Sequence, residues 1–223
     1  MIGVEVLDDP AADPALVQAE LRDLRRINAL FGGTRAVVGA LVPLFRASPG
    51  ARWTLLDVGT GSGDIPLALR RAAAAHGVTL TLFGLERIPS AAGAARAAGL
   101  AAVLGDGGAL PFPDRSVDIV IASQVLHHFS AEIATRWIAG FDRVARRAVV
   151  LADLRRSRAA MAGLWLASLA LRLHPATRHD GVLSLRRGYT VAEFAGLIER
   201  AGVRAPVRRR AIARLVASWA PVT

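Results

Sequence analysis

Residues 55–64 read Leu-Leu-Asp-Val-Gly-Thr-Gly-Ser-Gly-Asp. An apolar run at 53–58 leads into the glycines, as expected for a buried strand of a parallel sheet. A helix-forming segment at 65–76 follows them. Glycine lets the backbone turn tightly where a Cβ would clash, and a helix start offers unpaired N–H groups. The stretch therefore predicts a ligand-binding loop between a strand and a helix.

Two classes of ligand favour such a loop. A dinucleotide fingerprint is G-x-G-x-x-G, with the pyrophosphate over the start of the helix. Here the third glycine comes one position early, at Gly63, and Asp64 takes the place of the dinucleotide glycine. An acidic side chain suits a pyrophosphate poorly. The carboxylates of Asp64 and Asp57 together suit the ammonium and sulfonium groups of an aminoacyl cofactor.

Outward from this loop, apolar strands alternate with helical segments, a pattern typical of a mostly parallel sheet covered by helices. We expect an α/β Rossmann-like three-layer sandwich with a seven-stranded sheet. The predicted strands are 53–58, 79–85, 101–104, 117–122, 148–152, 207–211 and 214–219, and the predicted helices of this core are 65–76, 90–98, 131–144 and 191–201.

The chain divides into an N-terminal helical lid, 1–50, and a core, 51–223, with an insertion at 154–189. The lid has helices at 15–31 and 34–45, and the intervening Gly32-Gly33 either closes with the lid or simply stops a helix. In the insertion, 159–173 is apolar and too short to span a bilayer. It is a buried or dimer-interface helix, the wall of a lipophilic-substrate site, or a membrane-surface contact.

Composition limits the setting and the partners. The 223 residues include no cysteine, which excludes disulfides, thiolate metal sites and cysteine nucleophiles and fits a reducing cytoplasm. No basic, apolar signal peptide opens the chain. The net charge of +10 comes from arginine alone, which reflects either a GC-rich genome or attraction to anionic ligands. The 5% aromatic content argues against stacking on single-stranded bases.

The pattern D-x-G-x-G-x-G at 57–63 resembles motif I of the class I S-adenosylmethionine methyltransferases. Glu86 ends the second strand, where this family places an acid that binds both ribose hydroxyls. Asp106 follows the third strand, where the family's acid accepts a hydrogen bond from the adenine amine. Residues 110–118 resemble the ubiquinone/menaquinone methyltransferase branch. The resemblance, over 53–152, implies S-adenosylmethionine as cofactor.

Read residue by residue, the resemblance implies these cofactor contacts: Asp57, Gly59, Thr60, Gly61, Gly63, Asp64, Glu86, Arg87, Asp106, Gly107 and Ser123. Taken singly, Glu86 also reads as a solvated strand end and Asp106 as an ordinary turn former. Four ordered signals in one alternating pattern favour the cofactor.

The segment 123–129 follows the fourth strand, and the carboxyl ends of parallel strands form the ligand crevice. Methyl transfer to a hydroxyl needs alignment and removal of a proton, for which histidine is well suited near neutral pH. His127 and His128 are therefore candidate bases, and the alternative for both is packing or hydrogen bonding at the floor of the cofactor site.

The insertion supplies a second set of candidates. His179 beside Asp180 forms a candidate oriented base. The alternative for 177–181 and the arginines that follow is an exposed arginine-rich loop. The candidate substrate contacts across the chain are Asn28, Asp153, Arg178, Arg187 and Tyr189. No cluster predicts a metal site.

These features predict an S-adenosylmethionine-dependent methyltransferase that O-methylates a small aromatic or polyketide/quinone-like secondary metabolite in the cytoplasm. Arginine clusters at 143–147, 155–158 and 204–210 motivate an RNA methyltransferase as the alternative. Against a nucleic-acid partner, no RNA-binding module is appended, and Ser123-Gln124 stands where an Asn/Asp-Pro-Pro-Tyr motif would lie. A non-enzymatic cofactor-binding scaffold is a third hypothesis. A homodimer is left open, and no transmembrane segment is expected.

Overall fold

The computed structural model describes residues 3–221, so the first two residues of the predicted lid and the last two of the predicted core lie outside the described residues. The helices are α1 (Pro14–Leu30), α2 (Gly33–Arg46), α3 (Asp64–Ala74), α4 (Pro89–Ala97), α5 (Ala131–Val144), α6 (Arg158–Ala170), α7 (Pro175–Arg187) and α8 (Val191–Arg200), with short 3-10 turns η1 (Val6–Asp8) and η2 (Leu126–His128). The strands are β1 (Arg52–Val58), β2 (Thr79–Glu86), β3 (Ala101–Leu104), β4 (Val117–Ser123), β5 (Ala145–Leu154), β6 (Val207–Arg210) and β7 (Arg214–Trp219).

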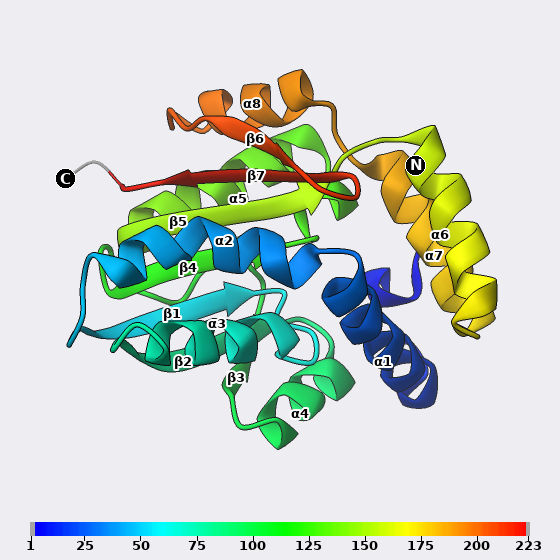
Figure 1. Ribbon diagram of the computed structural model, residues 1–223, viewed down its shortest axis with the longest axis horizontal. Helices are drawn as coiled ribbons and strands as arrows, with labels where there is room; N and C mark the ends of the chain where they lie inside the picture. The colour runs from blue at the N-terminus through cyan, green and yellow to red at the C-terminus, as the bar shows by residue number, and fades with distance from the viewer. Residues whose placement is uncertain (1–2, 222–223) are drawn as a thin grey trace.

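Within the described range the strands form one seven-stranded sheet in the order β3-β2-β1-β4-β5-β7-β6. The pairs from β3 to β5 are parallel, and β7 runs antiparallel to both β5 and β6. β1 lies between β2 and β4, with Leu55 opposite Leu82 on one side and Ile119 on the other. This arrangement confirms the predicted α/β Rossmann-like fold (Figure 1).

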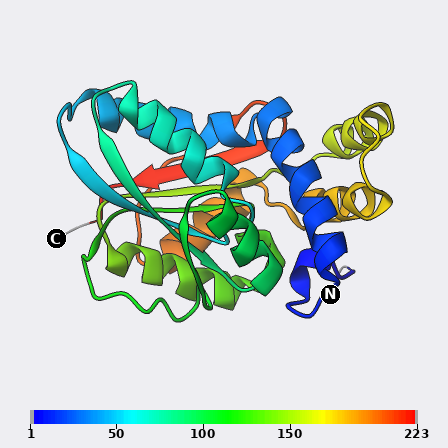
Figure 2. The ribbon, with the colours of Figure 1, turned by 90° about the horizontal axis from the view of Figure 1, so that it is seen from below.

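Helices cover both faces of the sheet, because alternate strand residues point to opposite sides. On one face Leu56 and Val120 pack with α5 and α8, and on the other Leu55 and Ile121 pack with α2 and α3. Figure 2 shows the sheet between these two helical layers.

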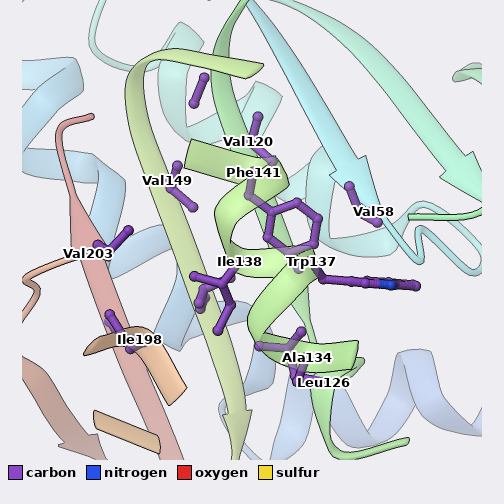
Figure 3. Close-up of a cluster of buried hydrophobic side chains, with 14 of the residues drawn as sticks. Val58, Val120, Leu126, Ala134, Trp137, Ile138, Phe141, Val149, Ile198 and Val203 are labelled. Atoms are coloured by element: carbon purple, nitrogen blue, oxygen red, sulfur yellow. The ribbon is translucent and has the colours of Figure 1, made fainter. Parts of the chain in front are cut away.

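The layer under α5 includes the buried aromatic residues Phe141 and Trp137. Phe141 and Ile138 of α5 are fully buried and pack beside Val149 of β5, as Figure 3 shows. Trp137 lies at the edge of this cluster, its ring 6.1 Å from that of Phe141 in an edge-on arrangement. The side chain of Trp137 therefore belongs both to the core and to the cavity described below.

The predicted lid divides between two structural roles. Val37, Leu41 and Phe45 of α2 are buried in the core cluster under the sheet, so α2 is a core helix. α1 lies beyond the carboxyl ends of the strands (Figure 1). Gly32 joins the two helices with φ at +79°, a left-handed conformation that suits glycine. The covering element is thus α1, and the boundary expected at residue 50 does not separate two structural units.

The insertion forms a pair of helices that pack on each other at the same end of the sheet (Figures 1 and 2). The loop expected at 177–181 is wrong, because this segment lies within α7. α6 already ends at Ala170, and Pro175 occupies the first turn of α7, where its missing N–H costs nothing. The buried-helix interpretation of 159–173 is also wrong, since Trp165 and Leu166 of α6 are exposed.

In the range 3–221, no single helix is long and apolar enough to cross a membrane. The α1–α2 pair meets that criterion only when its two helices are joined across a bend of 57°.

The N-terminus of α8 offers a test of how much a local capping interaction stabilises the protein. Thr190 and Glu193 form a reciprocal capping box at this end. Because a lost hydroxyl cap leaves a helical N–H unpaired, Thr190→Ala should lower the free energy of unfolding by about 1 kcal/mol. Thr190→Ser keeps the hydroxyl and should unfold like the wild type. Urea denaturation of both variants measures the difference, and equal midpoints would contradict the assigned cap.

Candidate functional site

A cavity of about 650 Å³ opens where the carboxyl ends of the strands meet α1, α6 and α7. This volume suits a cofactor together with part of a second molecule, since ligand pockets span roughly 300–1,000 Å³. Its walls come from the glycine loop, from the segments after β2, β3 and β4, and from the two insertion helices. The topology thus gathers the sequence-predicted cofactor segments around one space.

The glycine loop is a left-handed turn throughout. Gly59, Gly61 and Gly63 have φ values of +72°, +53° and +76°, which side chains rarely adopt. A Cβ on Gly59 would also lie 2.6 Å from the Val125 side chain. Gly59 and Gly61 line the cavity, whereas Gly63 lies behind it and caps the start of α3. Each glycine is therefore required by the backbone, and the first two bring that backbone to the ligand.

Glu86 ties β2 to the glycine loop. Its Oε2 accepts a hydrogen bond from the Gly61 N–H at 2.9 Å. Its Oε1 accepts from the Arg87 and Ile88 N–H groups at 2.8 and 3.1 Å. The carboxylate is thus fixed at the cavity edge with one acceptor site left over on Oε2, which fits a ribose hydroxyl of a nucleoside cofactor.

Two more carboxyl groups lie at the loop, and both are short of positive partners. Asp57 is buried beneath it and accepts a hydrogen bond from the Thr60 hydroxyl at 3.0 Å. Burial, with added repulsion from Asp64 and Glu86, raises the pKa of Asp57 well above its ordinary value. Burial also raises the pKa of Asp64. A cationic ligand such as a sulfonium or ammonium group would relieve this excess of negative charge.

The opposite end of the cofactor region is aromatic. Asp106 accepts a hydrogen bond from the Gly108 N–H at 2.7 Å and lines the cavity with Gly107. A Cβ on Gly107 would lie 2.5 Å from the Trp137 ring, so glycine is needed there. Trp137 packs on Phe129, with ring centroids 4.3 Å apart. This flat, apolar edge beside a carboxylate suits a base such as adenine.

A chain of hydrogen bonds connects the core to α1 and the glycine loop. Arg214 donates to Gln124 at 2.9 Å, Gln124 donates to Asn28 at 2.7 Å, and Asn28 donates to Asp64 at 3.1 Å. Burial lowers the pKa of Arg214 to about 10. Asn28, expected to contact substrate, therefore holds Asp64 in place. Sequence reasoning missed Gln124 and Arg214, although a glutamine at the end of a strand facing the crevice was a usable signal.

His127 and Asp153 form a buried pair at the floor of the cavity. His127 Nδ1 lies 2.6 Å from Asp153 Oδ1, and both side chains are 1% exposed. Burial alone would raise the pKa of Asp153, but His127 and the Leu154 N–H outweigh it and lower that pKa. His127 Nε2 has no hydrogen-bond partner among the described residues. The carboxylate thus orients the ring and leaves Nε2 for a ligand.

His128 belongs to a network with the N-terminal segment. Its Nδ1 lies 2.7 Å from Asp8, and its Nε2 lies 3.9 Å from Glu5. Arg187 donates to Glu5 and to Asp8 at 3.0 and 2.9 Å, and Ser184 donates to Glu5 at 2.7 Å. Sequence reasoning missed Glu5, because residues so far apart in the chain carry no joint local pattern.

Glu20 of α1 is a further group that sequence reasoning missed. It is 3% exposed and lines the cavity, and its Oε2 has no hydrogen-bond partner in the described range. Burial, with repulsion from Asp180 and Glu5, raises the pKa of Glu20 to about 8. Asp180 itself accepts from the Val6 N–H at 2.7 Å. The end of the cavity under α1 and α7 is therefore acidic.

The remaining candidates fall into two groups. Arg87 and Ser123 line the cavity, and Arg87 also donates to the Asp8 carbonyl at 2.7 Å. Arg178 and His179 instead lie in a separate surface depression on α7, with the His179 side chain 69% exposed. Tyr189 packs on Phe194 below the cavity, where burial raises its pKa. The structure therefore does not bring Arg178, His179 or Tyr189 to the cofactor region. Arg187 and Asp153 act through their hydrogen-bond partners and do not themselves line the cavity.

Comparison with known proteins agrees with this geometry. The family model described as a methyltransferase domain matches residues 56–152. The match covers the glycine loop, Glu86, Asp106, His127 and His128, and it confirms the predicted enzyme class and its cofactor, S-adenosylmethionine. A comparison with curated proteins finds no match.

Several solved structures share the fold over nearly the whole length of this chain. A SAM-dependent methyltransferase from Aquifex aeolicus is 19% identical, with 94% of this chain and 99% of that one covered at a TM-score of 0.63. A magnesium protoporphyrin IX methyltransferase from Synechocystis with bound SAH is 19% identical, with 92% and 87% covered and a TM-score of 0.57. Human N-acetylserotonin methyltransferase, in complex with SAM, is 16% identical, with 92% and 56% covered and a TM-score of 0.62.

The hydrogen-bond chain to Asp64 can be tested with a matched pair of glycines in α2. A Cβ at Gly33 would lie 2.5 Å from Asn28 Oδ1, whereas one at Gly39 meets nothing within 4 Å. Gly33→Ala should displace Asn28 and weaken binding of S-adenosylmethionine about tenfold, the effect of one lost hydrogen bond to a charged group. Gly39→Ala should leave the affinity unchanged. Calorimetric titration with S-adenosylmethionine measures both affinities. Equal affinities of Gly33→Ala and Gly39→Ala would show that Asn28 does not support cofactor binding.

The carboxyl groups at the loop predict a pH dependence. Asp57 and Asp64 have raised pKa values in the free protein, and a bound sulfonium and ammonium favour their ionised forms. Binding of S-adenosylmethionine should therefore release protons, and its affinity should fall as the pH is lowered through those raised pKa values. Calorimetry in buffers of different ionisation enthalpy counts the protons.

Two controls sharpen this measurement. Asp64→Asn should reduce the number of protons released. S-adenosylhomocysteine lacks the sulfonium charge and should release fewer protons than S-adenosylmethionine. Proton release equal to zero for the wild-type protein would contradict the assignment of both carboxyl groups to the cofactor.

Proposed function

We propose that this methyltransferase O-methylates a small, hydroxylated aromatic or polyketide/quinone-like metabolite. The observation that carries the proposal is the single cavity in which the cofactor loop, an apolar wall and an oriented histidine meet. The contacts at Asp57, Glu86 and Asp106 are assigned to the cofactor. The rest of the cavity is assigned to the acceptor.

The shape and polarity of the acceptor region support this substrate class. The inner side of α6 contributes Ala160, Gly163 and Leu164, and α1 contributes Leu24 and Ile27. Small and aliphatic side chains leave room for a flat apolar molecule and offer it little hydrogen bonding. Two proteins that share this fold are named as methyltransferases of magnesium protoporphyrin IX and of N-acetylserotonin, both small molecules. The ubiquinone/menaquinone branch itself stays a prediction.

Activation of the acceptor is assigned to His127. Methyl transfer forms an oxygen–carbon bond and breaks the sulfonium–carbon bond, so the hydroxyl must give up its proton on the way. An imidazole nitrogen without a partner acts on a hydroxyl in two ways: it accepts the proton, or it binds a metal ion that lowers the pKa of the hydroxyl. Asp153 orients the ring for either.

The proposed activity is tested with radiolabelled S-adenosylmethionine and a panel of phenols, hydroxyquinones and polyketide lactones. The expected result is label transfer to a hydroxyl oxygen, identified by mass spectrometry of the product. A matched panel without hydroxyl groups should accept none. Transfer to carbon or nitrogen, or to RNA alone, would overturn the proposal while leaving the methyltransferase domain intact.

His127→Ala should separate binding from chemistry. Because His127 lies at the acceptor end, its removal should leave the Kd for S-adenosylmethionine unchanged and lower kcat by about 10²–10⁴-fold. Asp153→Asn should lower kcat as well, since it disturbs the ring that Asp153 orients. His179→Ala is the control, because this exposed histidine lies outside the cavity and should retain full turnover. Wild-type kcat in His127→Ala would contradict the assignment, provided that its melting temperature shows a folded protein.

A further inference from the structure

Three potential metal ligands converge at the acceptor end of the cavity. Within the part of the chain that the structure describes, Glu5, His127 and His128 each offer one ligand atom, and these atoms lie within 4.8 Å of one another. All three residues line the cavity. Two of them come from η2, and Glu5 comes from the N-terminal segment across the cavity. Two imidazoles and one carboxylate form a donor set that first-row divalent metals commonly take.

Both histidines are held in the orientation that metal ligands require. The Nδ1 of His127 faces the Asp153 carboxylate at 2.6 Å, and the Nδ1 of His128 faces the Asp8 carboxylate at 2.7 Å. Such carboxylate partners fix the tautomer and make the other nitrogen more basic toward a metal. In each ring this leaves Nε2 as the ligand atom. A histidine used only for packing needs no carboxylate partner, whereas His127 and His128 each have one.

One ligand atom from each of the three residues can reach a shared ion, since these atoms lie within 4.8 Å of one another. His127 Nε2 is buried and has no hydrogen-bond partner in the described range. His128 Nε2 lies 3.9 Å from Glu5 Oε2, too long for a hydrogen bond. The two imidazole rings lie 4.2 Å apart and tilt by 33°. The 3.9 Å between His128 Nε2 and Glu5 Oε2 suits a shared ion, since each metal–ligand bond is about 2 Å long.

The surrounding charge also favours a cation. Asp8, Asp153 and Asp180 are partly or fully buried around the cluster, together with Glu5. Arg187 donates to Glu5 Oε1 and to Asp8, and it also lies 3.4 Å from His128 Nδ1. Glu5 Oε2 accepts from Ser184 at 2.7 Å and lies 3.9 Å from His128 Nε2. A divalent ion would add positive charge next to Glu5, whose pKa burial raises.

We propose that Glu5, His127 and His128 bind a divalent first-row transition metal ion, which holds the acceptor hydroxyl at its open positions. The inference deepens the proposed function and rests on it for the role of the metal in catalysis. It replaces the expectation from the sequence that the chain has no metal site. Because Glu5 precedes α1, the bound ion would also tie the covering segment to the core.

The chemistry balances without a further reactant. The acceptor hydroxyl coordinates the ion, which lowers its pKa, and the proton leaves to solvent. The resulting oxygen anion attacks the methyl carbon as the carbon–sulfur bond breaks, and its electron pair stays on sulfur. The products are the methyl ether and neutral S-adenosylhomocysteine. The ion remains divalent throughout, so no oxidant or reductant is needed.

Cobalt(II) is the probe for the experiment, on full-length, untagged protein that has been treated with a chelator. One Co²⁺ per chain should bind and give visible absorption bands of a low-coordinate site with nitrogen ligands. Zn²⁺ should displace it in a calorimetric titration. Glu5→Gln and His128→Gln should each weaken Co²⁺ binding by more than about 100-fold, and Asp8→Asn should weaken it by about 10–100-fold, as for other groups that only orient a ligand.

His179→Ala is the matched control, since this exposed histidine also hydrogen-bonds a carboxylate but lies outside the cluster. It should bind Co²⁺ like the wild type. Absence of the visible bands, or equal binding in the wild type and in both Glu5→Gln and His128→Gln, would overturn the site. Unchanged melting temperatures show that the variants are folded.

Binding of S-adenosylmethionine to the chelator-treated protein separates this inference from the proposed function. Cofactor binding and methyl transfer to a hydroxyl without Co²⁺ binding would leave the proposed function standing and the metal site refuted. Co²⁺ binding without methyl transfer to any hydroxyl would refute the proposed function and the catalytic role of the ion, with the site itself retained.

Discussion

The hydrogen bond from the Gly61 N–H to Glu86 is the contact on which the rest of the site depends. It joins the loop after β1 to the end of β2, and it requires the left-handed backbone that only glycine adopts freely at this turn. With the loop fixed, Asp64 begins α3 at the cavity edge, where Asn28 from α1 reaches it. The covering helix is thus positioned by the same turn that positions the cofactor.

The core of the fold could be predicted from the sequence because its signals are local. Strand β3 and helix α5 have the predicted bounds, since β3 is a short apolar run at the edge of the sheet and α5 has one apolar face. α7 was missed because Pro175 was interpreted only as a breaker, and a segment of arginines, histidines and Gly181 has no clear apolar face. Packing against α6 and α1 stabilises that helix, and packing has no signature in a single segment.

The two ends of the cavity also differ in how far the sequence predicts them. The cofactor end is built from strand ends in the order of the chain, so the resemblance at these strand ends could indicate Asp57, Glu86 and Asp106, and all three line one cavity. The acceptor end is built from contacts across 120 to 182 residues, such as His128 with Asp8 and Arg187 with Glu5. No pattern in one sequence joins such positions. The sequence pointed to His127 and Asp153 separately, and only the fold makes them a pair.

The distribution of charge explains why both ends of the cavity favour a cationic ligand although the chain is basic overall. The net charge of +10 resides in arginines, which are long and remain at the surface or pair with carboxylates there. The carboxyl groups that line the cavity are short and buried, so few arginines reach them. At one end Asp57 and Asp64 favour the sulfonium and ammonium of the cofactor, and at the other Glu5 and the two histidines favour a metal ion. Because S-adenosylhomocysteine has lost the sulfonium charge, the acidic end holds it less strongly than the cofactor, which assists its release after each transfer.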